Sequence, residues 1–533
     1  MIAKLSLIAA VLYIALCLVG FGYFIYKYRS EIKKVEDKKG AYTFTYLVLA
    51  MISAVCILGY SLLLFSDHAS IDAMNLINNM DPMWHLMLGR YTNCATLELA
   101  KRIGMHQVTD QHIFLCIWLV TLIAEIFIIG TAIVKRLNLD TKLKNASVYL
   151  IVSVAFVNVF YNELMLFPEM AMTFIFTNLS LALAIYFALS DLKFVIKWAA
   201  STVFLLISIG AYQSFIGIYV AFVLIGIFFK YKDQIKQRYI QSITSLVIGA
   251  GSCVFNLVFM SALIKTGVMS YSGRGATSSI GLILNNIKSI ILYQPRLWKS
   301  ADGILMDYSM FIMIAVIFVL WCLAIRKYKL EQKLFCIALF AISYFVVFVP
   351  HIPEEFIDLS PRSNIALWSF VSIAMLFVLS EYIGKIQKKI VFGVFLSLIC
   401  AFVLLNVTTM QDMTANAEKT NAIDYSEAEQ FANKIKKYES ENNITVNYIA
   451  IVLDKNPMQT VIGSRYTQGF LGERSLYHFY PGRLLIQHYV GHELQMTNTD
   501  EAIAQEYAQK DWTSFNPDEQ IFFINDIAYY VMY

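Results

Sequence analysis

The sequence predicts an α-helical polytopic membrane protein with about 12 transmembrane helices, followed by a C-terminal extracytoplasmic α/β domain. Of its 533 residues, 58% are hydrophobic and only 15% are charged, and the mean hydropathy is +0.60. Soluble domains carry roughly 25% charged residues, so this composition excludes a soluble enzyme and a disordered protein. The apolar residues also gather in long stretches that end near residue 409.

Twelve of these stretches are long enough to cross a bilayer, which takes about 20 apolar residues for about 30 Å of hydrocarbon. None of the nine prolines lies in the middle of a stretch, so we expect mostly unbroken helices. Unbroken helices argue against a transporter, because transporters often bind substrate at discontinuous helices. The stretches are 5–26, 42–65, 113–134, 147–163, 170–190, 194–211, 214–230, 240–264, 309–325, 333–350, 364–381 and 390–409.

Five short connectors set the predicted orientation. They hold 21 Lys/Arg and 6 Asp/Glu, and all five fall on one side when twelve spans are counted. Short basic loops stay in the cytoplasm, so we expect the loops 66–112 and 265–308, the tail and both termini on the outer side. The connectors are 27–40, 135–144, 230–238, 326–333 and 385–389.

The chain therefore divides into a transmembrane domain, residues 1–409, and an extracytoplasmic domain, residues 410–533. The two differ in charge: 33 Lys/Arg and 21 Asp/Glu precede residue 410, whereas 9 Lys/Arg and 17 Asp/Glu follow it. Within the tail we expect a helix over 424–437, strands over 443–453 and 520–532, and a helix and a turn over 497–519.

Two carboxylates and a histidine follow the second span directly. Asp67, His68 and Asp72 lie within a few residues of the expected membrane surface. A carboxylate here could act as general base toward a hydroxyl group; a solvated loop start with a helix cap is the alternative. Residues 80–91 then predict an interfacial amphipathic helix. Arg90 near its end could bind a phosphate through its guanidinium fork, or simply reach the lipid surface.

Other polar residues lie near the expected external ends of spans. Glu163 and Glu169 flank the turn at Pro168, where they could bind a substrate or be hydrated turn residues. Tyr212 and Gln213 follow the sixth span, where they could hydrogen-bond a sugar or join neighbouring helices.

Basic residues in two external loops form a further group. Arg274 and Arg296 lie in the loop 265–308, and Arg362 lies in the Pro-rich segment 350–363. Such residues could hold an anionic lipid headgroup such as a phosphate; chance surface charge is the alternative. Glu125, near the centre of the third span, predicts a protonated or paired structural residue.

The sequence supports no cofactor. Its eight cysteines show no CxxC or other metal-ligand spacing, which argues against a zinc site and against a disulfide framework. No Gly-rich nucleotide-binding loop is visible either. The spacing of possible ligands therefore does not support a divalent-metal site.

Three short motifs and the end of the chain carry a family resemblance. Ser70-Ile71-Asp72, Gly89-Arg90-Tyr91 and Ala211-Tyr212-Gln213-Ser214 occur in this order, and Trp512-x-x-Phe515-Asn516-Pro517 precedes the last strand. In these features the chain resembles the Gtr type II (GtrII-like) glucosyltransferases that modify O-antigen and cell-wall glycans. The resemblance implies a bacterial, multi-pass glycosyltransferase of the GT-C type in the cytoplasmic membrane.

The resemblance also implies a reaction. Such enzymes transfer a hexose from a polyprenyl-phosphate donor to a cell-surface glycan on the extracytoplasmic side, with an essential carboxylate in the first external loop. Here that implies Asp72 as the catalytic base and Arg90 as a ligand of the donor phosphate. A second carboxylate is expected two positions after Asp72, where this chain has Met74, so Asp67 becomes the candidate for that role.

This reaction has implications for the stereochemistry, the acceptor and further site residues. In-line displacement with a single base inverts the anomeric carbon, and a tail of net charge −8 suits a glycan acceptor better than an anionic lipid phosphate. A lipid-linked-sugar flippase or transporter and a membrane acyltransferase stay as alternatives. Further donor-phosphate candidates are Arg274, Arg296 and Arg362, and substrate-binding candidates are His68, Glu163, Glu169, Tyr212 and Gln213.

Overall fold

The computed structural model describes residues 2–66, 68, 70, 73, 82–137, 139–270, 279–386, 389–461 and 472–533. It separates into two compact units. The membrane unit comprises Met1–Leu64, Met80–Met165 and Met170–Met410. The tail unit comprises Phe65–Asn79, Leu166–Glu169 and Gln411–Tyr533.

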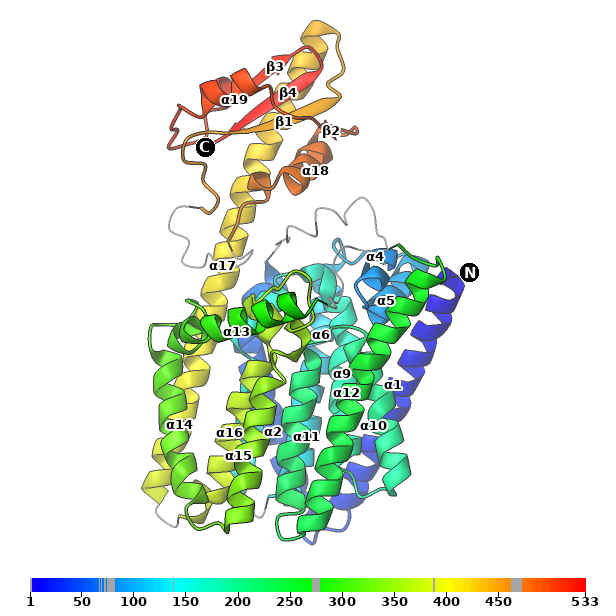
Figure 1. Ribbon diagram of the computed structural model, residues 1–533, viewed down its shortest axis with the longest axis vertical. Coiled ribbons are helices and arrows are strands. Elements are labelled where there is room, and N and C mark those ends of the chain that lie inside the picture. The colour runs from blue at the N-terminus through cyan, green and yellow to red at the C-terminus, as the bar shows by residue number, and fades with distance from the viewer. Residues whose placement is uncertain are drawn as a thin grey trace. The chain divides into compact units, whose positions relative to one another are not determined.

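Helices build the membrane unit (Figure 1). In chain order they are α1 (Ile2–Ile32), α2 (Lys38–Phe65), α4 (Pro82–Met87), α5 (Tyr91–Arg102), α6 (Gln111–Val134), α7 (Lys142–Val154), α8 (Val159–Met165), α9 (Ala171–Leu189), α10 (Phe194–Ile209), α11 (Phe215–Lys230), α12 (Ile235–Lys265), α13 (Ile280–Ser300), α14 (Ser309–Ile325), α15 (Leu330–Phe345), α16 (Ala366–Glu381) and the first part of α17 (Lys389–Asn442). Short 3₁₀ turns η1 (Pro168–Met170), η2 (Val349–His351), η3 (Pro361–Asn364) and η4 (Ile383–Lys385) lie between them.

The core of this unit is made of helices that are apolar on every side. In α11, all residues from Phe215 to Phe229 are buried, and α9 and α16 are nearly as enclosed. A helix that is hydrophobic all round belongs inside a protein. Peripheral helices instead expose apolar side chains, such as Val19 of α1 (72% exposed) and Val247 of α12 (65%). Such surfaces match the hydrocarbon of a bilayer.

The structure confirms only part of the predicted number of membrane spans. A helix, or the bent pair α7–α8, overlaps each of the twelve apolar stretches. Among the described residues, however, only seven helices are long and apolar enough to cross a membrane, or eight if the bent pair counts as one span. Helices α10, α11 and α14 have 16 or 17 residues, about 25 Å at 1.5 Å per residue. The count of twelve is therefore not confirmed.

One span is broken without a proline. α7 and α8 meet at an angle of 51°. The cause is Asn158, whose side-chain oxygen accepts hydrogen bonds from the backbone N–H groups of Phe160 (3.1 Å) and Tyr161 (3.0 Å). Its amide nitrogen donates to the carbonyl of Val154 (3.1 Å). One side chain thus caps the start of α8 and the end of α7.

The five basic connectors lie together at one end of the membrane unit, which we call the basic end. In Figure 1 the α1–α2, α11–α12 and α14–α15 connections share this end, while α4, α5 and α13 lie at the other. Two ion pairs join connectors to one another, Lys135–Glu31 (2.5 Å) and Arg238–Glu331 (2.5 Å). Two further contacts reach the residues just before the last connector: Lys144 donates to the Gly384 carbonyl (2.7 Å), and Lys232 pairs with Glu381. This arrangement agrees with the prediction that the five connectors lie on one side of the membrane. That this side faces the cytoplasm stays a prediction.

The predicted external loops contain helices. Residues 265–308 include the 21-residue helix α13, which runs across the bundle instead of along it (Figure 1). The interfacial helix expected over 80–91 is shorter: α4 ends at Met87, and a turn at Leu88–Gly89 leads into α5. Gly89 permits this turn because its φ of +76° lies in the left-handed region.

The tail unit contains a four-stranded sheet of order β2-β1-β4-β3. β1 pairs in parallel with both β2 and β4, and β3 and β4 form an antiparallel hairpin. The elements are the second part of α17, β1 (Tyr448–Leu453), η5 (Ser475–Tyr477), α18 (Phe479–Val490), β2 (Gln495–Met496), α19 (Glu501–Tyr507), α20 (Pro517–Gln520), β3 (Ile521–Ile524) and β4 (Ile527–Met532).

Helices cover both faces of this sheet. On one face, Phe431 and Ile435 of α17 and Ile486 of α18 pack with Ile449 and Tyr530. The other face, with Ala450 and Val531 at its centre, packs against Ile503, Tyr507 and Trp512 of the α19 region. The expected α/β layer is therefore present.

Two details of the tail differ from the sequence prediction. The helix expected over 424–437 is part of α17, which runs for 54 residues without interruption. The single strand expected over 520–532 is instead the β3–β4 hairpin, because Asn525 adopts a left-handed conformation (φ 55°) that reverses the chain.

Candidate active site

Four chain segments bring polar side chains together at the end of the membrane unit opposite the basic end. They are the end of α8, the turn between α10 and α11, the link between α4 and α5, and the segment that contains η3. We call the side chains of Arg90, Glu163, Tyr212, Asp358 and Arg362 the polar cluster.

An ion pair between α8 and η3 forms the buried part of the cluster. Arg362 donates from Nη1 to Glu163 Oε1 (2.9 Å) and from its backbone N–H to Glu163 Oε2 (2.5 Å). Its Nη2 also donates to Asp358 (3.3 Å). The Glu163 side chain is fully buried, so its charge depends on this partner. One cation thus holds two carboxylates.

The pKa values outside the spans agree with this pairing. Burial alone would lower the pKa of Arg362, but the carboxylates of Glu163 and Asp358 outweigh it and hold that pKa above its usual value. Burial would likewise raise the pKa of Asp358, but the Arg362 guanidinium and the hydrogen bonds from Ser360 together outweigh it and hold that pKa below its usual range. The Arg362–Asp358 contact therefore stays ionic near neutral pH.

Tyr212 connects this ion pair to Arg90. Its hydroxyl donates to the backbone carbonyl of Arg362 (3.4 Å), and the guanidinium carbon of Arg90 lies 5.2 Å from the centre of its ring. Burial raises the pKa of Tyr212 to about 12, so its phenol is neutral and can donate. The half-buried Arg90 therefore has one face against an aromatic ring, an arrangement typical of an oriented guanidinium.

Two side-chain amides fix the backbone that carries Arg90. Gln213 donates to the Leu88 carbonyl (3.1 Å), and Asn256 donates to the Gly89 carbonyl (2.9 Å). A Cβ at Gly89 would lie 2.8 Å from the Asn256 side-chain oxygen and would strain the positive φ, so a larger residue would disturb this support. Gln213, predicted as a sugar ligand, thus makes a structural contact with the α4–α5 link.

A second layer supports the segment 351–364. His351 contacts Glu354 (3.2 Å) and the Ser363 carbonyl (3.3 Å) through its two ring nitrogens. Asn286 of α13 donates to the carbonyls of Ile352 (3.1 Å) and Glu354 (2.7 Å). α13 is therefore tied to the segment that presents Arg362.

The candidates predicted from the sequence do not include three residues of this region, Asp358, His85 and Asn256. His85 of α4 is buried, and neither of its ring nitrogens has a hydrogen-bond partner among the described residues. Burial, together with the charge of Arg90, lowers the pKa of His85 to about 3, so this ring stays neutral. Asn256 had one detectable signal, a polar side chain inside an apolar span.

The other predicted residues divide into two groups. Asp67, Asp72 and Arg274 lie outside the residues that the structure describes. His68 is buried, with Nδ1 3.3 Å from the Ser66 hydroxyl, and Glu169 accepts from the Ser70 hydroxyl (3.0 Å) within the tail unit. Arg296 of α13 pairs with Asp302 (2.8 Å).

In the described part of the chain, no group of three or more His, Cys, Asp or Glu side chains is arranged to hold a metal ion.

Comparison with known proteins identifies the family. The family model described as "Glucosyl transferase GtrII" matches residues 60–379, a range that contains every member of the polar cluster. No curated protein and no solved structure matches the chain. Because the match covers more than half of the chain and agrees with the resemblance of its motifs, this protein belongs to the GtrII glucosyl transferase family.

Proposed function

We propose that this membrane glucosyltransferase moves a hexose from a polyprenyl-phosphate-linked donor to a cell-surface glycan on the external face of the cytoplasmic membrane. The observation that carries the proposal is the polar cluster: charged and aromatic side chains from four distant segments meet opposite the basic end, inside the family match. A lipid-linked donor presents its phosphosugar at this kind of level, where the spans end.

Arg90 is the proposed ligand of the donor phosphate. A guanidinium can donate two parallel hydrogen bonds to a phosphate, and the ring of Tyr212 orients it for that contact. Arg362 is already held by two carboxylates, so a phosphate would replace its longer contact, the one to Asp358 (3.3 Å). Arg274 and Arg296 are further candidates for this role.

The proposed reaction is a single displacement of the GT-C type. An acceptor hydroxyl attacks the anomeric carbon while Asp72, assisted by Asp67, takes the hydroxyl proton. The bond between the anomeric carbon and the phosphate oxygen breaks, and the lipid phosphate leaves with the negative charge that Arg90 stabilises. One displacement inverts the anomeric carbon.

Sugar contacts complete the proposed site. His68, Glu163, Glu169, Tyr212 and Gln213 are the proposed substrate-binding residues. Hydrogen bonds to backbone carbonyls hold Tyr212 and Gln213 at fixed positions, and their side-chain oxygens can accept from sugar hydroxyls.

The test is transfer of radiolabelled glucose from a synthetic polyprenyl-phosphate donor to cell-wall glycan by the purified full-length protein. We expect Asp72→Asn to lower the rate at least about 100-fold, the usual contribution of a general base. The control is Asp140→Asn, which removes an exposed carboxylate at the basic end and should keep full activity. Full activity of a well-folded Asp72→Asn protein would exclude the assignment. If the wild type moved the labelled lipid across vesicles without transferring sugar, the flippase alternative would replace the proposal.

A further inference from the structure

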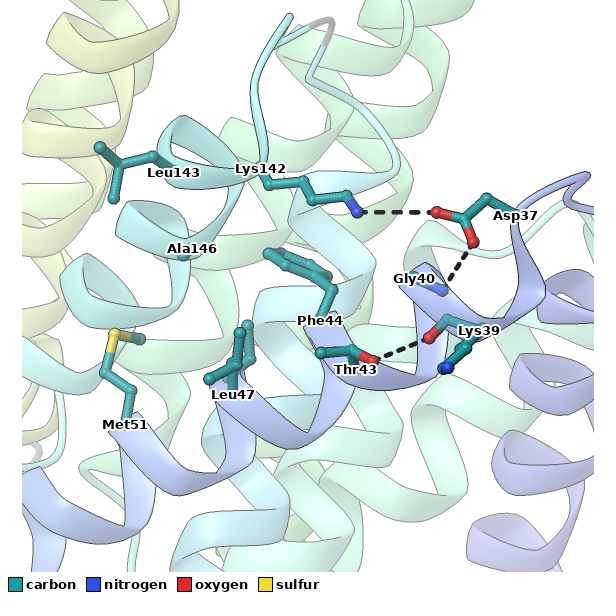
Figure 2. A pocket seen from close by; sticks show the side chains of 11 residues that line it. Asp37, Lys39, Gly40, Thr43, Phe44, Leu47, Met51, Lys142, Leu143 and Ala146 are labelled. Carbon is teal, nitrogen blue, oxygen red and sulfur yellow. Dashed lines mark hydrogen bonds and ion pairs between the residues drawn. The ribbon is translucent and has the colours of Figure 1, made fainter.

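A groove between α2 and α7 lies at the basic end, far from the polar cluster. Its volume is about 580 Å³, within the roughly 300–1,000 Å³ typical of small-molecule sites. Figure 2 shows its wall, formed by Phe44, Leu47 and Met51 of α2 and by Leu143 and Ala146 of α7. These five wall residues are all apolar and carry no charge.

The mouth of the groove is cationic. Lys39 and Lys142 line it together with a single carboxylate, Asp37. Lys142 lies 3.9 Å from Asp37, and both side chains are 70% exposed, so this ion pair is weak and exchangeable. Among the residues drawn in Figure 2, Lys39 interacts only through its backbone carbonyl, which accepts from the Thr43 hydroxyl (2.9 Å), and its ammonium pairs with none of them.

Two helices also begin at this mouth. α2 starts at Lys38 and α7 at Lys142, so the positive ends of two helix dipoles point toward the same place. Asp37 already accepts from the Gly40 N–H (2.8 Å), which shows that an anion is held at the start of α2. An anionic group near Lys39 and Lys142 would therefore be attracted by the two ammonium groups and by the positive ends of the two helix dipoles.

The position of the groove shows whether its occupant could be the lipid-linked sugar donor. α2 runs for 28 residues, about 42 Å, from the groove to the other end of the membrane unit. Likewise, the bent pair α7–α8 leads from Lys142 at the groove to Glu163 in the polar cluster. A lipid in the groove therefore has its headgroup at the opposite membrane surface from the proposed reaction, which excludes the reacting donor as its occupant.

We propose that the groove is a binding site for an anionic phospholipid of the leaflet at the basic end. The phosphate lies between Lys39 and Lys142, and one acyl chain lies along Leu47, Met51 and Ala146. Basic pockets between spans recognise anionic headgroups in this way, and each Lys near the surface contributes about 1 kcal/mol. The bound lipid joins the starts of α2 and α7.

The experiment is native mass spectrometry of the full-length protein with dioleoylphosphatidylglycerol, dioleoylphosphatidylcholine or a polyprenyl phosphate. We expect the wild type to retain phosphatidylglycerol in preference to phosphatidylcholine. Lys39→Ala/Lys142→Ala should weaken this retention roughly thirtyfold, because two lysines are lost. Ala146→Trp, which fills the groove without a change of charge, should also weaken it.

The matched control is Lys33→Ala/Lys34→Ala, which removes two exposed lysines of the same connector outside the groove. It should change retention only slightly. Equal losses in the control and the groove variants would overturn the proposal, as would normal retention in Ala146→Trp. Retention of the polyprenyl phosphate alone, with loss in the groove variants, would assign the groove to the donor lipid and would equally overturn it.

Discussion

At the residue scale, the Glu163–Arg362 and Arg362–Asp358 contacts share one guanidinium but differ in burial. The Glu163 carboxylate is fully buried, whereas the Asp358 side chain is 56% exposed. Loss of one partner from a buried pair leaves an uncompensated charge, while an exposed pair exchanges its partner for water. Removal of the Glu163 charge should therefore destabilise the protein more than removal of the Asp358 charge.

We expect Glu163→Gln to lower the free energy of unfolding by about 3 kcal/mol. Asp358→Asn should lower it by less than about 1 kcal/mol, because water replaces most of the contact. Denaturant unfolding of the detergent-solubilised protein measures both values. Equal effects of the two variants would contradict the buried pairing.

His85 predicts a pH dependence of stability. Its pKa is about 3 in the folded protein, against 6.5 when exposed. Below pH 6.5 the unfolded chain binds a proton that the folded protein does not, so stability falls as the pH drops from 6.5 toward 3, by about 1.4 kcal/mol per pH unit.

The measurement compares unfolding free energies at pH 7 and pH 5. His85→Gln should remove about 2 kcal/mol of the loss at pH 5. His488→Gln, which replaces an exposed histidine of α18, should leave the loss unchanged. A wild-type pH profile in His85→Gln would show that this ring titrates normally.

At the element scale, a buried network holds the second part of α17 to the sheet of the tail unit. Arg474 is fully buried and donates from Nε to Asp424 (2.8 Å) and from Nη2 to Glu427. Glu427 in turn accepts from the hydroxyls of Tyr530 (2.9 Å) and Tyr533 (2.6 Å). The helix, the segment before η5 and the end of β4 therefore share one charged centre.

We expect Arg474→Met to destabilise the tail unit by about 3–5 kcal/mol, since two buried carboxylates lose their cation. Lys434→Met removes the partner of the 82% exposed Asp518 and should cost under about 1 kcal/mol. Hydrogen exchange of the β1 and β4 amides reports the difference. Unchanged protection in Arg474→Met would show that the network contributes little.

At the scale of the whole molecule, charge divides the chain. The five basic connectors hold 21 Lys/Arg and lie at one end of the membrane unit, whereas the tail carries a net charge of −8. Short basic loops resist translocation, so we predict that the basic end faces the cytoplasm and that the tail is external.

A membrane-impermeant maleimide on intact cells tests this orientation. Cysteines introduced at Lys34 and Lys236 should be protected, and a cysteine at Ser440 should react. Cys116, Cys322 and Cys400 are exposed on the protein surface and should first be replaced by serine. Labelling at 34 or 236 without labelling at 440 would invert the topology.

Features that depend on local composition can be predicted from the amino-acid sequence. The helical membrane part, the position of a helix in each apolar stretch and the acidic α/β tail follow from hydropathy and charge, because a bilayer demands them segment by segment. The short motifs likewise indicated the family that the match over 60–379 confirms. The sequence also indicates each candidate individually: Arg90, Glu163, Tyr212, Gln213 and Arg362.

Which of these residues contact one another depends on the packing of segments that are distant in the chain. Glu163 and Arg362 are 199 positions apart, and nothing in either segment specifies the other as its partner. The same holds for Asn256, which supports Gly89 from 167 positions away. The bend at Asn158 and the reversal at Asn525 depend on single side-chain and backbone conformations that hydropathy does not record. Packing between distant spans minimises unsatisfied polar groups over the whole molecule, and that condition has no local signal.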